Sequence, residues 1–220
     1  FGDKKTLYRE ICESLALGAA DAQTIYKRIG VKGAGDDYKH LKNLTLSGFI
    51  ARDYRWHFNS GEVAKIPWYR LSDNYCRFYL KYIRPNQHKI ENNAYTDIAL
   101  TSLPGWSSIV GLQIENLVLN NRQLIKETLG IQQQEVICEN PYAQRATKSK
   151  KGCQIDYLIQ TTFNTLYLCE IKYSRDPVQA SVIDEVKQKM DALGVKNNFS
   201  IRPVLIHCNA VSEAVEESGF

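Results

Sequence analysis

Apolar positions in the first seventy residues follow a helical period and then change to the period of a hairpin. Three helices and two strands are expected in that order, over residues 6–17, 20–29, 36–46, 49–58 and 63–71. Leu7, Ile11 and Leu15 share one face of the first helix, and Asn59-Ser60-Gly61 between the strands predicts a turn. Three helices and a hairpin predict a winged helix-turn-helix, with residues 36–47 as its candidate recognition helix.

The second half of the chain predicts a mixed sheet covered by helices. The elements expected are a helix over 109–129, a strand over 135–139, two strands that flank the turn Thr162-Phe163-Asn164, a helix over 179–193 and a strand over 202–207. The order αβββαβ makes the last helix a crossover before a parallel strand. The fold class is therefore α/β (α+β). The domains expected are a winged helix-turn-helix over 1–70, an aromatic-rich helical connector over 71–108 and an αβββαβ domain over 109–220.

Two acids interrupt the apolar strands around the turn at residues 162–164. With that turn, or with a five-residue turn centred on Phe163, Asp156 lies opposite Glu170, and Lys172 follows on the same face as Glu170. Opposed residues have Cβ atoms roughly 4.5–5.5 Å apart, and like charges at that distance destabilise a sheet. Either one carboxyl is protonated or a cation lies between the pair. Lys172 supplies one positive charge, and two carboxylates also suit Mg²⁺ or Mn²⁺.

A third acid, Glu115, lies on the helix expected over 109–129. Its neighbours one turn away are apolar, so its side chain is expected to face the sheet, where an unpaired charge is unfavourable. Two interpretations stay open: Glu115 joins the pair of acids, or it forms a salt bridge with Lys172 or Arg122.

Basic and amide side chains gather in two places that suit nucleic-acid contacts. The recognition helix offers Lys39, His40, Lys42 and Asn43, and the hairpin adds Arg52 and Arg55. A loop before the Asp156 strand carries Arg145, Lys148, Lys150 and Lys151. The same residues also fit solvated surfaces or, on the winged helix, a face that packs against a protein partner.

Composition indicates a cytoplasmic protein with no membrane segment. The chain has 220 residues, a net charge of +4 and 44% hydrophobic residues, and it contains neither a long apolar run nor a signal-peptide pattern. Its six cysteines lack metal-finger spacing and are expected to be buried free thiols. The sequence begins with Phe1 and its one methionine is Met190, so we expect it to belong to a longer polypeptide.

The spacing of these acids resembles the PD-(D/E)XK nuclease superfamily. Asp156, thirteen intervening residues and then Glu170-Ile171-Lys172 lie between a helix bearing Glu115 and a later helix and strand, so the resemblance covers roughly residues 109–210. Ile155 stands where the motif often has proline. The resemblance implies a restriction-endonuclease-like core that hydrolyses phosphodiester bonds in DNA. It implies Mg²⁺ or Mn²⁺ ligands at Asp156, Glu170, Ile171 (through its carbonyl) and Glu115, with Lys172 as a further catalytic residue.

The whole chain is similar to the C-terminal part of a group of archaeal-type prokaryotic AAA ATPases. In those proteins a nucleotide-binding domain comes first, and the P-loop motif is missing here, so an N-terminal AAA ATPase domain of the same polypeptide is the expected partner besides DNA. Gln188 or Lys187 either assists at the site or lies on a polar helix face. The function expected is a metal-dependent DNA endonuclease module. The alternatives are a catalytically inactive DNA-binding or regulatory domain and, less directly, a winged-helix transcription regulator.

Overall fold

The computed structural model describes residues 5–31, 37–144, 146–148, 151–195 and 198–219. The chain divides into two compact units, of which the first contains residues 1–53 and 65–109 and the second contains residues 54–64 and 110–220. The domain boundaries expected near residues 70 and 108 stay a prediction. No helix in the described ranges is both long enough and apolar enough to cross a membrane.

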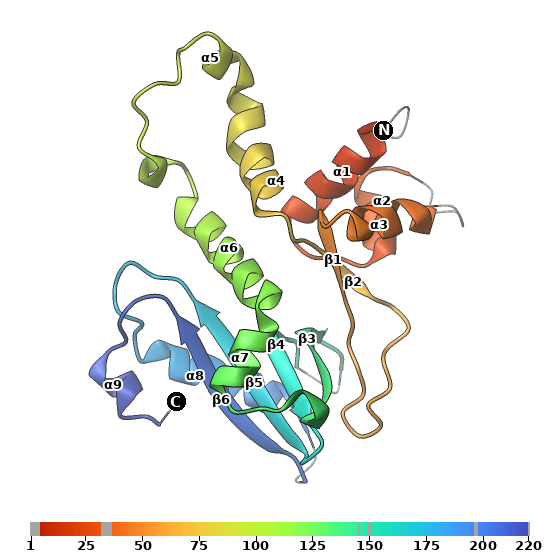
Figure 1. Cartoon of the computed structure of the whole chain (residues 1–220), viewed down its shortest axis with the longest axis vertical. Coiled ribbons are helices and arrows are strands. Elements are labelled where there is room, and N and C mark those ends of the chain that lie inside the picture. Colours follow the sequence, from red (N-terminus) through yellow and green to blue (C-terminus); the bar gives the residue numbers. More distant parts are fainter. Residues whose placement is uncertain (1–4, 32–36, 145, 149–150, 196–197, 220) are drawn as a thin grey trace. The chain divides into compact units, whose positions relative to one another are not determined.

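The first unit contains the three helices and the small hairpin that the sequence predicts (Figure 1). Its elements are α1 (Lys5–Ala16), α2 (Ala22–Arg28), α3 (Asp37–Leu46), β1 (Ile50–Asp53) and β2 (Trp68–Leu71). Asp21 begins α2 because its carboxylate accepts a hydrogen bond from the Thr24 N–H at 2.8 Å. Leu15, Ile25 and Leu41 are fully buried at the centre of the unit.

The paired part of the hairpin is shorter than predicted. β1 and β2 pair antiparallel from Ile50↔Leu71 to Asp53↔Trp68. Beyond them, only the isolated bridge Trp56↔Val63 joins the two sides of the hairpin. The predicted turn is present, with the Gly61 N–H donating to the His57 carbonyl at 2.8 Å. Pro67 cannot donate a ladder hydrogen bond, which accounts for the late start of β2.

A helical connector follows the hairpin, as predicted, but it is broken into short pieces. They are α4 (Asn74–Phe78), a π-helical turn (Tyr79–Ile83), a 3₁₀ turn (Arg84–Asn86), α5 (Gln87–Glu91) and a second 3₁₀ turn (Leu100–Ser102). Phe78 and Tyr82 pack with ring centroids 5.4 Å apart, and Tyr82 lies in a small core with Leu103 and Ile109. Phe78 and Tyr82 of this aromatic-rich segment therefore contribute to a core, whereas Tyr75 is exposed.

The second unit is a four-stranded mixed sheet with helices. Its strands are β3 (Val136–Gln144), β4 (Cys153–Thr161), β5 (Thr165–Lys172) and β6 (Ser200–His207), in the order β3-β4-β5-β6. β4 is antiparallel to both β3 and β5, whereas β6 runs parallel to β5 after the crossover helix α8 (Ser181–Leu193). The predicted α/β fold class is confirmed.

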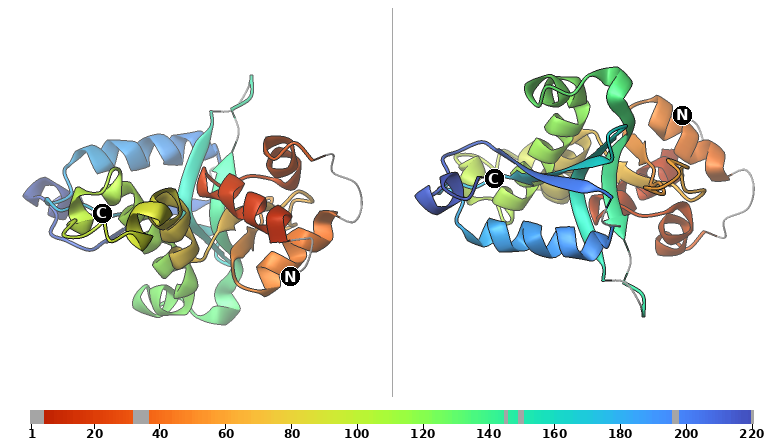
Figure 2. Two further views of the ribbon diagram at one scale, coloured as in Figure 1. Left: turned by 90° about the horizontal axis from the view of Figure 1, so that it is seen from above. Right: turned by 90° about the horizontal axis from the view of Figure 1, so that it is seen from below.

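Helices cover both faces of this sheet, and each side has its own core (Figure 2). On one face α8 buries Val182 and Val186 against Leu158 and Leu168. On the other face, α6 (Trp106–Asn120) and α7 (Arg122–Thr128) contribute to a second core around Tyr157. Gly194 ends α8 in a left-handed conformation (φ 55°), which glycine adopts without strain. A short α9 (Glu213–Glu216) closes the described chain.

Two predicted elements of this unit were wrong in their extent. The helix expected over 109–129 is two helices, because the backbone leaves helical geometry at Asn121 (φ −119°, ψ 35°), where the side-chain amide donates to the Leu117 carbonyl at 2.7 Å. β3 is longer than the strand expected over 135–139. It continues past Pro141, which an edge strand tolerates at a register shift between Asn140 and Tyr142.

The outer end of the hairpin, residues 54–64, belongs to the second unit and forms part of its core; we call this segment the hairpin arm. Trp56 is 3% exposed and lies in the same core as Leu158. Its indole N–H donates to the Gln160 side-chain oxygen at 2.5 Å, and the Gln160 amide donates to the Phe58 carbonyl at 2.7 Å. Gln160 on β4 is 1% exposed, so these two bonds satisfy an amide that would otherwise be buried without partners.

Candidate active site

The turn between β4 and β5 has the geometry that the sequence predicts. It contains residues 162–164, and Asn164 adopts a left-handed conformation (φ 50°). The ladder pairs Tyr157 with Cys169 and Leu158 with Leu168. The ladder ends one step before Asp156 and Glu170, so their direct opposition stays a prediction.

Asp156 lies where β4 departs from regular pairing. Between the pairs Asn140↔Leu158 and Tyr142↔Ile155, β4 has one residue more than β3, which is the signature of a β-bulge. Simple alternation is therefore wrong here, since Ile155 and Leu158 lie in the same core although they are three positions apart.

A backbone group of β5 holds the Asp156 carboxylate. The register given for β4 and β5 ends at Tyr157↔Cys169, and beyond it the Asp156 Oδ2 accepts a hydrogen bond from the Ile171 N–H at 2.9 Å. A side-chain oxygen is thus bonded to a strand N–H of β5. This fixes the carboxylate beside the strand that carries Glu170.

Glu170 is the buried acid of the pair, and two lysines neutralise it. Its side chain is only 4% exposed, and its Oε1 lies 3.2 Å from the Lys172 Nζ. Its Oε2 forms an ion pair with Lys189 of α8. A buried carboxylate is tolerated only when it is paired and hydrogen-bonded, and here each oxygen has its own ammonium partner.

Lys172 also has a second acidic partner. Its Nζ donates to the Glu185 Oε2 at 2.6 Å, in addition to its contact with Glu170. Burial alone lowers the pKa of Lys172, but the hydrogen bond with Glu185 and the charge of Glu170 outweigh it, so the pKa is raised above its ordinary value. Lys172 therefore remains positively charged at neutral pH.

Asp156 lacks comparable neutralisation, and its pKa is raised to about 6. Burial is the largest cause, and the negative charge of Glu170 adds to it. The Ile171 N–H and the charges of Lys189 and Lys172 act in the opposite direction without cancelling the rise. One more positive charge beside the pair would therefore stabilise the ionised form of Asp156.

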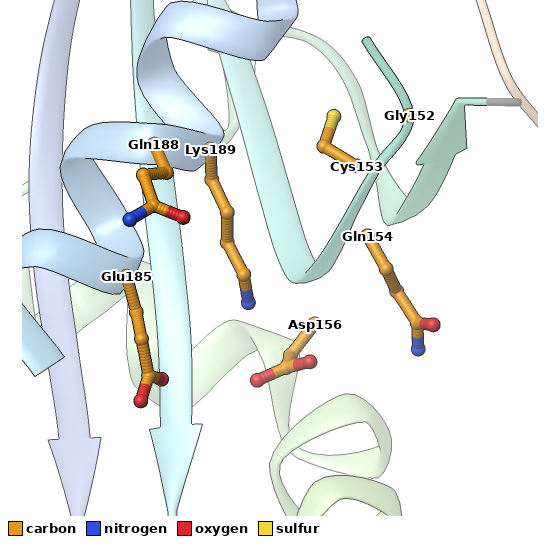
Figure 3. Close-up of a pocket in the computed structure, with 7 residues that line it drawn as sticks. All are labelled: Gly152, Cys153, Gln154, Asp156, Glu185, Gln188 and Lys189. Carbon is orange, nitrogen blue, oxygen red and sulfur yellow. The ribbon is translucent and has the colours of Figure 1, made fainter. Parts of the chain in front are cut away.

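A pocket of about 380 Å³ opens beside this pair (Figure 3). Its lining residues are Gly152, Cys153, Gln154, Asp156, Glu185, Gln188 and Lys189. Glu185, Gln188 and Lys189 come from α8, and the Lys189 side chain points toward Asp156. The pocket is polar around the carboxylate and gives a ligand access to it.

The chemistry of this donor set fits a divalent metal ion. Asp156 and Glu170 are hard oxygen donors on neighbouring strands, and the Ile171 carbonyl lies in the backbone between Glu170 and Lys172. The Lys189 ammonium, paired with Glu170, shows that a cation is accepted at this position. Asp156, Glu170 and the Ile171 carbonyl would hold the ion.

Glu115 does not stand with this pair as a third ligand in the structure. Within residues 5–31, 37–144, 146–148, 151–195 and 198–219, no three His, Cys, Asp or Glu side chains gather into a group that could hold a metal. Glu115 is partly buried on α6 and has an interaction of its own. Its role as a ligand stays a prediction.

Of the first-unit residues expected to contact nucleic acid, some are exposed and others contact neighbouring side chains. Lys39 and Lys42 are exposed on α3. Asn43 is half-buried and donates to the Tyr8 hydroxyl at 2.8 Å. His40 is buried with its ring 5.3 Å from that of Tyr8, so its expected exposure was wrong.

In the second unit, Arg55 is half-buried rather than on an open face, and its guanidinium donates to the Ala143 carbonyl at 3.4 Å. Of the expected basic loop, Lys148 and Lys151 are exposed, whereas Arg145 and Lys150 lie outside the described residues. Contact of any of these basic residues with nucleic acid stays a prediction. All six cysteines are free, but Cys208 is exposed, so its expected burial was wrong.

Sequence reasoning missed Glu185 and Lys189. Both lie on α8 with Gln188, at positions i, i+3 and i+4, which share one helix face. That spacing could have predicted a polar face of α8. Since α8 is the crossover after β5, this face could have been expected to contact Glu170 and Lys172. Gln188 lines the pocket, whereas Lys187 is exposed and does not.

No family model and no curated protein sequence matches the chain. Among solved structures, the chain is similar to a repair endonuclease from Pyrococcus abyssi, with 17% sequence identity and a TM-score of 0.32. The alignment covers 47% of this chain and 39% of that endonuclease. A similarity this weak carries no argument, so what can be said of function rests on the geometry of Asp156, Glu170 and their lysines.

Proposed function

We propose that the second unit carries a divalent-metal-dependent phosphodiesterase site that hydrolyses DNA. The observation that carries the proposal is the adjacent pair Asp156 and Glu170, with Lys172 3.2 Å from Glu170, beside an accessible pocket. Asp156, Glu170 and the Ile171 carbonyl would hold the ion. When bound, such an ion supplies a Lewis acid for the phosphate charge and lowers the pKa of water.

Lys172 acts as a fixed positive charge in this proposal. Its raised pKa keeps the ammonium protonated at neutral pH, which does not suit a general base. An ammonium held between Glu170 and Glu185 is instead placed to orient a water molecule or to stabilise negative charge that develops on a phosphate oxygen. The Ile171 N–H keeps the Asp156 carboxylate in one orientation throughout.

The catalytic proposal is tested by nicking of supercoiled plasmid DNA with Mg²⁺ or Mn²⁺. Wild type is compared with Asp156→Ala and Lys172→Ala, and Lys187→Ala serves as a control because it removes an exposed lysine of α8 that does not line the pocket. Nicking by wild type and the control, with loss in the other two variants, supports the proposal. Equal nicking by all four proteins would identify a contaminating nuclease and refute it.

A second candidate is a catalytically inactive DNA-binding or regulatory domain. It is favoured by one observation, the pairing of both Glu170 oxygens with lysines. DNA binding that weakens steeply with salt, without cleavage of duplex, single-stranded or branched DNA under any metal condition, would support this candidate.

The association with an AAA ATPase domain rests on the sequence resemblance alone, and the cytoplasmic location rests on composition. The first is tested by comparing cleavage by the longer polypeptide with and without ATP.

A further inference from the structure

We propose that Lys189 is an internal counter-cation of Glu170 that a divalent metal ion must displace, so that this lysine sets the metal affinity of the site. The inference rests on the proposed function, because it assigns a role to Lys189 at the same pair of carboxylates. It goes beyond it by naming a residue that opposes metal entry.

The geometry places Lys189 where an incoming ion would bind. Its ammonium is paired with the Glu170 Oε2, and its side chain extends into the pocket that Asp156 lines (Figure 3). The Lys189 side chain is 22% exposed and the Glu170 side chain is 4% exposed, so the pair is only weakly screened by solvent. A cation that uses the Glu170 oxygens therefore competes with an ammonium already there.

The two lysines of the site differ in the partners that they would keep when a metal ion binds Glu170. Lys172 keeps Glu185, whose oxygen accepts at 2.6 Å. In the part of the chain that the structure describes, Glu170 is the one hydrogen-bond and ion-pair partner of Lys189. Metal binding at Glu170 thus leaves Lys172 paired and releases Lys189 toward the pocket.

The charge balance agrees with this division of roles. Asp156, Glu170 and Glu185 contribute three negative charges, and Lys172 and Lys189 contribute two positive ones. The site is thus near neutrality without a metal, which explains how Glu170 stays buried in its absence. A divalent ion added to both lysines would make the site positive, whereas exchange of the ion for the Lys189 ammonium avoids that.

The test measures metal binding without DNA, by isothermal titration with Mn²⁺ and separately with Ca²⁺. Lys189→Met keeps the length and apolar stem of the side chain and removes its charge. Loss of one positive charge a few ångströms from the metal is expected to tighten binding at least about tenfold. Lys189→Arg keeps the charge and is expected to bind like wild type, and Lys187→Met is the matched control on the exposed face of α8.

The outcomes separate this inference from the proposed function. Tighter binding by Lys189→Met, with Lys189→Arg and Lys187→Met near wild type, supports the competitor role. Equal or weaker binding by Lys189→Met overturns it and leaves the metal site standing, provided that Asp156→Asn loses binding. Absence of binding in wild type and Lys189→Met alike, with both proteins folded by circular dichroism, overturns the metal site itself.

Discussion

Replacing Asp156 with asparagine is expected to stabilise the folded protein at neutral pH and to abolish the proposed metal binding. The asparagine side chain has nearly the same shape, and its carbonyl oxygen can still accept the hydrogen bond that the Ile171 N–H donates at 2.9 Å. What disappears is the negative charge that burial and Glu170 oppose.

The magnitude follows from the pKa of Asp156. Its rise from the ordinary value of 3.8 to about 6 means that the folded state binds the proton more tightly than the unfolded state does. Ionisation above pH 6 therefore opposes folding by up to about 3 kcal/mol, and this cost falls to about 1.5 kcal/mol at pH 5 and nearly vanishes below about pH 3.5. The larger figure is an upper limit, because part of Asp156 remains exposed to solvent.

Urea unfolding, followed by far-ultraviolet circular dichroism at several pH values between about 4 and 8, measures the effect. The variant should be more stable than wild type at about pH 7.5, and the difference should shrink as the pH falls through the Asp156 pKa. Asp176→Asn, at an exposed acid, should change stability by less than about 0.5 kcal/mol. A variant that is no more stable than wild type at neutral pH, or a difference independent of pH, would refute the reasoning.

Three further predictions, on a buried tryptophan, an ion pair and a turn, are tested by the same unfolding measurement. Trp56→Ala should lose about 3–5 kcal/mol because it empties a buried site and leaves the Gln160 amide without one partner; a loss below about 1 kcal/mol would contradict the role of this arm in the core. Lys126→Met should lose about 3 kcal/mol because Glu139, paired at 2.9 Å, keeps a partly buried charge, and the added change Glu139→Gln should recover part of it. Asn164→Ala should lose about 1 kcal/mol, whereas Asn164→Gly should not, because only the alanine is strained at φ 50°; equal losses would contradict the turn.

The local periodicities were enough to predict the fold class and the register of the hairpin that carries the two acids. Asn164 at the turn agrees with the observed register from Gln160↔Leu166 to Tyr157↔Cys169, which ends one step before Asp156 and Glu170. These features depend on residues close in sequence, where turn chemistry and strand alternation determine the geometry.

What sequence could not predict depends on contacts between distant segments. The bulge at Asp156 comes from unequal residue numbers in β3 and β4, which no pattern within β4 alone reveals. The ion pair between Lys189 and Glu170 requires knowing how α8 is rotated against the sheet. His40 was assigned to an exposed face from its polarity, but contact with the Tyr8 ring accounts for its burial.

The hairpin arm over residues 54–64 limits how this protein can be divided into working pieces. A fragment that begins at residue 109 would contain every strand of the sheet and both acids, yet it would lack Trp56 and Phe58, which complete the core beside Gln160. The catalytic proposal should therefore be examined in chains that retain the arm, or with the arm added as a separate peptide. Recombination that exchanges the sheet alone would likewise separate its core from Trp56 and Phe58. Because the hairpin arm lies within the sequence of the first unit, the two compact units are expected to be inherited together.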